Sequence, residues 1–174
     1  KVGVDIDKEY PDLDILIENM KETMVNASGV GLAAPQIGKA IRLFIVNATP
    51  FSEDDELETE ERELLANFEK VFINAKILKE EGDDWAFNEG CLSIPDVRED
   101  VFRQEKITIE YLDENFEKHT EVIDGIAARI VQHEYDHIEG ILFTDKISSL
   151  KKRLIKKRLE NISKGKIKVD YRMK

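Results

Sequence analysis

The chain has 174 residues, of which 41% are hydrophobic and 36% charged. This length allows one domain, residues 1–174, with a substantial core, and no apolar run reaches the roughly 18 residues that a membrane-spanning helix needs. The net charge of −11 is unevenly distributed, because residues 146–174 contain twelve Lys or Arg and two acids, a net +10, which leaves −21 on the rest. We therefore expect a soluble protein with an acidic body and a basic C-terminal segment.

The single cysteine, Cys91, excludes an internal disulfide. A lone cysteine indicates a reducing compartment or a thiol that is kept for its chemistry.

The first predicted element is an amphipathic helix near the start of the chain. Asp12 is a suitable N-cap, and Ser28-Gly29 provides a stop signal. Between them, apolar residues recur at helical spacing, so one face should be buried. These residues are Leu13, Leu16, Ile17, Met20 and Met24.

Two short strands and an acidic segment follow. Residues 41–46 and 71–78 are apolar runs of strand length, the first of them after the glycine-containing segment 29–38. Residues 53–63, between the two runs, contain eight acids and one arginine. Such a charge run predicts an exposed loop or a frayed helix, to which we assign no chemistry.

A hairpin is predicted next. Residues 106–112 and 116–122 flank the turn-forming sequence Asp-Glu-Asn at 113–115. Ile107, Ile109 and Tyr111 alternate with polar residues, as in a strand with one buried face.

A second helix is predicted to begin after Asp124, a suitable cap, with Ile126, Ile130 and Val131 on its first turns. This helix would carry the sequence HEYDH at residues 133–137.

The sequence HEYDH indicates a metal centre. Residues four apart lie on the same face of a helix, so His133 and His137 can direct two imidazoles at one cation. Glu134 would project beside them and could act as an acid or a base. The pattern therefore predicts metal-dependent hydrolysis, although several metallohydrolase families share it.

The third ligand distinguishes among these families. The metzincin pattern needs a histidine ten residues after the first, where this chain has Phe143. The glutamates downstream of the motif, Glu139 and Glu160, are poorly placed for a thermolysin-like site. Cys91 is the remaining soft ligand, and two imidazoles with one thiolate leave an open position for water. A structural site would need a fourth ligand, for which only His119 remains, so a catalytic three-ligand site fits better.

Three segments, taken in this order, resemble the signature motifs of the peptide deformylase family: GVGLAAPQIG at 29–38, EGCLS at 89–93 and QHEYDH at 132–137. The resemblance implies an α+β fold in which antiparallel β-strands pack around a central helix carrying the His-Glu-x-x-His motif. It also implies a cytoplasmic enzyme that removes the formyl group from N-formyl-methionine at the N-terminus of newly synthesised polypeptides and releases formate. The implied physiological metal is Fe2+, with Zn2+, Ni2+ or Co2+ as substitutes in purified protein.

The resemblance also assigns roles within the reaction. Glu134 would take a proton from the attacking water and give it to the departing amine. The side-chain amide of Gln36 and the backbone N–H of Leu92 would stabilise the oxyanion that develops on the formyl carbon.

Substrate contacts are expected from a groove and a pocket. Gly31 and the region of Gly90 would let an extended peptide approach closely, and Arg98 would lie near the mouth. An arginine in the pocket wall would bury its alkyl stem and keep its charged head in water. The candidates for the methionine pocket are Val30, Ile126, Arg129 and Ile130.

The basic segment contains a predicted C-terminal helix. Residues 151–158 are mostly Lys and Arg, with Leu150, Leu154 and Ile155 near one side. Such a helix suits an anionic surface such as RNA, and we expect it to bind the ribosome near the tunnel exit. The alternative is a helix that packs its apolar residues on the body and leaves its lysines in solvent.

Two other functions stay open at this point: a zinc endopeptidase with the same helix motif, and a non-catalytic metal-binding factor associated with the ribosome. The expected partners are formylated nascent peptides and the ribosome, with no membrane and no disulfide partner, and we expect a monomer.

Overall fold

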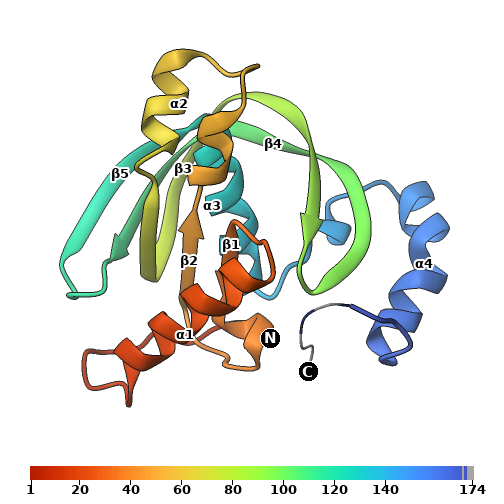
Figure 1. The fold of residues 1–174 in the computed structure, drawn as a ribbon, viewed down its shortest axis with the longest axis horizontal. Coiled ribbons are helices and arrows are strands. Elements are labelled where there is room, and N and C mark those ends of the chain that lie inside the picture. Colours follow the sequence, from red (N-terminus) through yellow and green to blue (C-terminus); the bar gives the residue numbers. More distant parts are fainter. Residues whose placement is uncertain (170, 172–174) are drawn as a thin grey trace.

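The computed structural model describes residues 1–169 and 171. Within these residues, four α-helices accompany one antiparallel sheet whose five strands follow each other in space in chain order (Figure 1). The strands are β1 (Gly31–Ala33), β2 (Leu43–Asn47), β3 (Glu69–Cys91), β4 (Ile94–Leu112) and β5 (Lys118–Asp124). The helices are α1 (Leu13–Asn26), α2 (Thr59–Leu65), α3 (Gly125–Ile138) and α4 (Ser149–Ser163). The predicted α+β fold with antiparallel strands is confirmed, and none of the described helices is long and apolar enough to cross a membrane.

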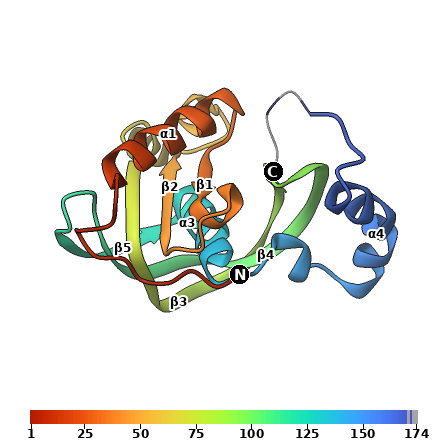
Figure 2. The same ribbon diagram turned by 90° about the horizontal axis from the view of Figure 1, so that it is seen from below.

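Helix α3 lies at the centre of the molecule, within the curve of the sheet, and α1 lies outside it (Figures 1 and 2). Strand β2 runs between these two helices, so both of its faces are buried. Phe44 and Val46 belong to the core cluster of α3, whereas Leu43 and Ile45 belong to the cluster of α1. Because successive side chains point to opposite faces, a strand covered on both sides reads as an unbroken apolar run.

Helix α1 confirms the first predicted helix, since Leu13, Ile17, Met20 and Met24 are buried. Strand β2 begins two residues later than predicted, because Ile41 instead forms an isolated bridge with Val4.

The predicted hairpin of residues 106–112 and 116–122 is present as the end of β4 paired with β5. A second and much longer hairpin, formed by β3 and β4, was not predicted. Strand β3 continues through residues 78–91, which are mostly polar and largely exposed, so the apolar pattern did not indicate it. Its backbone pairs with β4 to the end of the hairpin, where Gly90 lies opposite Arg98 and Cys91 opposite Ile94. The long hairpin thus brings Cys91 to α3 from a distant part of the chain.

Helix α4 confirms the predicted C-terminal helix, but its apolar side differs from the predicted one. Leu150 and Leu154 are 67% and 75% exposed. Ile155, Leu159 and Ile162 instead pack against a small cluster that includes Val97 and Phe143. Asp170 and the last three residues of the predicted basic segment lie outside the described residues.

The acidic segment contributes to the start of α3. Part of it forms α2, and Oε1 of Glu61 accepts a hydrogen bond of 3.0 Å from the backbone N–H of Ile126. Asp124 occupies the N-cap position as predicted, but its side chain makes no capping hydrogen bond. Glu61 therefore supplies a carboxylate where the helix has free N–H groups and positive partial charge.

We predict that Glu61→Ala lowers the free energy of unfolding by about 0.5–2 kcal/mol, because a capping acceptor at the first turn is lost. Urea denaturation measures this loss. Glu63→Ala is the control, because Glu63 is an exposed acid on the same helix. Equal losses in both variants would contradict the capping role.

Candidate active site

Helix α3 is unusual because many of its buried side chains are polar or charged. Buried polar groups are costly unless they are hydrogen-bonded, so such a helix requires partners from other elements. The buried polar residues of α3 are Arg129, Gln132, His133, Glu134, Asp136 and His137.

The three predicted metal ligands lie together. Cys91, at the end of β3, and His133 and His137, one turn apart on α3, offer ligand atoms that all lie within 4.8 Å of one another. The Sγ of Cys91 is 3.2 Å from Nε2 of His137. Phe143, which excluded the metzincin pattern, stacks on the His133 ring with the centroids 6.1 Å apart.

The chemistry of this donor set fits a divalent cation. Nδ1 of His133 hydrogen-bonds Oε2 of Glu89 at 2.9 Å, which leaves its Nε2 free to bind a metal. One thiolate and two imidazoles are typical of a catalytic site with an open fourth position.

The two histidines have opposite pKa shifts. Burial and the charge of His133 lower the pKa of His137 to about 3, so this imidazole is neutral, as a ligand must be. Burial opposes protonation of His133 too, but hydrogen bonds with Cys91 and Glu89 raise its pKa to about 10. Because Cys91 is itself a candidate ligand, a proton and a metal ion compete at this position.

Glu134 lies beside the ligands. Its side chain is buried, and its Oε2 has no hydrogen-bond partner among the described residues. Burial raises the pKa of Glu134 to about 7. Gly31 lies directly against this carboxylate, so a larger residue at this position of β1 would have to displace the buried Glu134 side chain.

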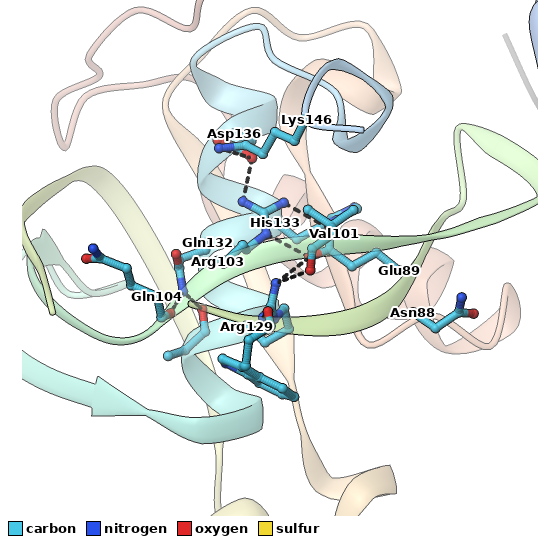
Figure 3. A network of polar contacts seen from close by, with 12 residues as sticks. Asn88, Glu89, Val101, Arg103, Gln104, Arg129, Gln132, His133, Asp136 and Lys146 are labelled. Atoms are coloured by element: carbon cyan, nitrogen blue, oxygen red, sulfur yellow. Dashed lines mark hydrogen bonds and ion pairs between the residues drawn. The ribbon is translucent and has the colours of Figure 1, made fainter. Parts of the chain in front are cut away.

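Glu89 is the centre of a buried polar network (Figure 3). Besides His133, it accepts hydrogen bonds from Nε and Nη2 of Arg103, at 2.7 and 2.9 Å, and from Nη1 of Arg129, at 3.1 Å. Burial alone would raise the pKa of Glu89, but the hydrogen bonds from Arg103 and His133 hold it well below its usual range. The network therefore keeps a negative charge next to His133.

The same network explains Asp136, whose role the sequence did not reveal. Nη1 of Arg103 lies 2.6 Å from Oδ2 of Asp136, and Nζ of Lys146 lies 3.3 Å from the same oxygen. Arg103 therefore connects α3 to both strands of the long hairpin.

Arg129 differs from its prediction. Its head does not lie in water: the residue is 2% exposed, and Nη2 donates to the carbonyl of Trp85 at 2.7 Å. The guanidinium also lies 4.4 Å from the centre of the Trp85 ring. Hydrogen bonds and the aromatic face replace water around this charge.

Gln36 contacts Cys91, and Leu92 follows Cys91 directly in the chain. Gln36 lies in a short 3-10 helix, where its Oε1 accepts a hydrogen bond from the backbone N–H of Ala33 at 2.7 Å. This bond directs Nε2 toward Sγ of Cys91, at 3.5 Å, and Oγ of Ser93, at 3.1 Å.

Gln36, Cys91 and Leu92 border one cleft of about 790 Å³. Of the predicted substrate residues, all but Ile126 line it; Ile126 lies in the core cluster of α3 instead. The predicted residues in its lining are Val30, Gly31, Gly90, Arg98, Arg129 and Ile130. Sequence reasoning missed Phe51, Phe87 and Tyr171 as lining residues, because none belongs to a motif or a periodic pattern that points to the cleft.

The fold and the site together define a metal-dependent hydrolase. A family model described as polypeptide deformylase matches residues 2–153. The chain is 64% identical to a peptide deformylase of Christiangramia forsetii and 63% identical to one of Flavobacterium johnsoniae, in each case over all of this chain and 89% of the relative.

Solved structures of peptide deformylases have the same fold. A peptide deformylase of Plasmodium falciparum has a TM-score of 0.79 and 30% identity, covering 95% of this chain and 90% of that one. One from Legionella pneumophila has a TM-score of 0.78 and 32% identity, covering 95% of this chain and 89% of that one. The chain belongs to the polypeptide deformylase family. It is a peptide deformylase enzyme, which removes the N-formyl group from nascent peptides.

We predict that Arg103→Met lowers the free energy of unfolding by about 3–5 kcal/mol, because it leaves Glu89 and Asp136 without their shared buried cation. Urea denaturation measures the change. Arg98→Met is the control, since Arg98 makes exposed hydrogen bonds to Asn88. A loss no larger than that of the control would contradict this role.

Proposed function

We propose that Cys91, His133 and His137 hold one divalent cation and that Glu134 moves the proton during hydrolysis of N-formyl-methionyl peptides. The observation that carries this proposal is the grouping of the three ligand atoms within 4.8 Å beside the unpartnered Oε2 of Glu134. A bound divalent cation supplies Lewis-acid chemistry at this position. We further propose Fe2+ as the physiological ion, because the donor set accepts several metals and the family resemblance favours iron.

Glu134 serves both halves of the reaction in this proposal. Its carboxylate takes a proton from the attacking water as the new C–O bond forms on the formyl carbon. It then gives that proton to the methionine nitrogen as the C–N bond breaks. Formate and a free amino terminus are the products.

Gln36 and Leu92 stabilise the negative charge that develops on the formyl oxygen. Nε2 of Gln36 is held by the hydrogen bond from Ala33 to the other end of the amide, so it needs no reorganisation. The backbone N–H of Leu92 is the second donor.

The peptide binds in the cleft in an extended form. Gly31, Val30, Gly90 and Arg98 border its backbone path, and Ile130 with the stem of Arg129 contributes to the methionine pocket. Support for this assignment comes from their shared position in the lining of one cleft. Residues 1–174 act as one catalytic domain in this proposal, with a basic C-terminal segment from about residue 146.

We predict that Glu134→Gln abolishes formate release from formyl-Met peptides while the protein retains its metal, because the amide keeps the shape but cannot accept the proton. Anaerobic purification, elemental analysis and a formate assay measure both properties. Glu139→Gln is the control, since Glu139 ends the same helix and pairs with Arg42 at 2.7 Å.

Full activity of Glu134→Gln would contradict the assigned role. In the unmodified chain, cleavage of internal bonds in unformylated peptides would instead support an endopeptidase. Bound iron without formate release in the unmodified chain would support a non-catalytic factor.

The basic face of α4 is proposed to bind the ribosome near the tunnel exit. Arg153, Lys156 and Lys157 are exposed, while Ile155 and Leu159 attach the helix to the body. A fixed helix with exposed cations suits the phosphates of RNA.

We predict that the double variant Arg153→Glu and Lys157→Glu weakens ribosome binding about tenfold or more at low salt, because it reverses two charges on this face. Co-sedimentation at several salt concentrations measures the effect. The control makes the same change in charge at Lys8 and Lys76, which are exposed elsewhere on the body. Equal weakening by both variants would exclude α4 as a specific surface.

A further inference from the structure

The chain beyond α4 returns to the active-site cleft. Gly165 has a positive φ of 64°, and the backbone N–H of Lys166 donates to the carbonyl of Asn161 at 2.8 Å. A left-handed residue after a helix reverses the chain and favours glycine. The segment then runs back from α4 toward the turn between β3 and β4 (Figure 2).

Contacts of α4 with the hairpin fix the start of this segment. Nζ of Lys151 lies 2.8 Å from Glu99, and Nη2 of Arg158 lies 2.5 Å from Asp96, both on β4. Ile155, Leu159 and Ile162 pack on the apolar cluster beside them. Helix α4 therefore holds the segment next to the turn that carries Leu92.

The end of the segment bonds to that turn. The hydroxyl of Tyr171 donates a 2.7 Å hydrogen bond to the backbone carbonyl of Leu92. Leu92 is the residue whose N–H is assigned to the oxyanion, and its carbonyl belongs to the next peptide unit. A bond to this carbonyl restrains the conformation on one side of the donor.

Residues of the segment also line the cleft. Lys168, Val169 and Tyr171 line it together with Gly29 and Val30, the two residues that precede β1. The C-terminal segment and the residues before β1 thus border the same cleft. A peptide that extends outward from the metal ligands advances about 3.3 Å per residue, so its later residues reach the outer parts of the cleft.

We propose that the segment formed by Lys168, Val169 and Tyr171 is a wall of the peptide cleft, and that Tyr171 is a positioning residue for Leu92. This inference rests on the proposed roles of Leu92 and the cleft. The segment helps to bind residues downstream of formyl-methionine, and the Tyr171 hydroxyl improves turnover by restraining the oxyanion donor.

Two variants of the metal-loaded full chain test this inference. Tyr171→Phe removes only the hydroxyl, and it should lower kcat about 2- to 10-fold, the effect of one hydrogen bond. Its KM for a formyl-Met dipeptide should stay unchanged. The matched control is Tyr10→Phe, because Tyr10 packs against the α1 cluster, away from the cleft lining. An unchanged kcat in Tyr171→Phe would overturn the positioning role.

Deletion of residues 168–174 tests the wall. KM should rise several-fold for a formyl-Met tetrapeptide and much less for the dipeptide, a split that a general loss of stability would not produce. If the ratio of KM for the tetrapeptide to KM for the dipeptide equals that of the unmodified chain, the proposed wall is refuted. Increased activity would refute it too, because it would show that the segment blocks the cleft.

Measurements on the unmodified chain distinguish failure of this inference from failure of the proposed function. Absence of formate release by the unmodified, iron-loaded chain would refute the proposed function itself. Normal release by the unmodified chain with unchanged variants would refute the further inference alone.

Discussion

The buried carboxylate of Glu89 is the interaction on which the rest of the site depends. Arg103, Arg129 and His133 all donate hydrogen bonds to it, and all four residues are nearly excluded from solvent. Buried charges of this kind are stable only when each has a partner, because the cost of desolvation exceeds the attraction of a poorly matched pair. The network therefore allows one relative placement of the hairpin and α3.

The placement of the hairpin against α3 brings Cys91 and His133 together. Glu89 lies two residues before Cys91 on β3, so the same strand that restrains the His133 ring also presents the thiolate. Arg103 on β4 extends the connection to Asp136, one turn along α3 from His133. The proposed metal ligands thus belong to one unit of two strands and one helix, whose buried hydrogen bonds set the ligand geometry before an ion binds.

Much of this arrangement could be predicted from the sequence, and for identifiable reasons. The spacing of His133 and His137 is local, and the periodicity of α1 is strong. Cys91 could be chosen as a ligand because other candidates were absent or badly placed.

The rest depends on pairings that are distant in sequence. The mostly polar residues 79–88, beyond the predicted strand 71–78, gave no strand signal, because the pairing of β3 with β4 in this region relies on backbone hydrogen bonds rather than a buried face. Arg129 was expected to reach water because nothing local showed that Glu89 and Trp85 would surround it. Glu61 bonds to Ile126, which is 65 positions away in the sequence, and Tyr171 bonds to Leu92, which is 79 positions away.

The affinity of the site for Zn2+ in Glu89→Gln tests most directly whether the Glu89 network holds the metal ligands. The unmodified chain and the variant would be compared by competition with a chelator, with circular dichroism to show that both are folded. We expect the variant to bind Zn2+ about 10- to 100-fold more weakly, as is typical when a ligand histidine loses its carboxylate partner. Equal affinity in the folded variant would contradict the account.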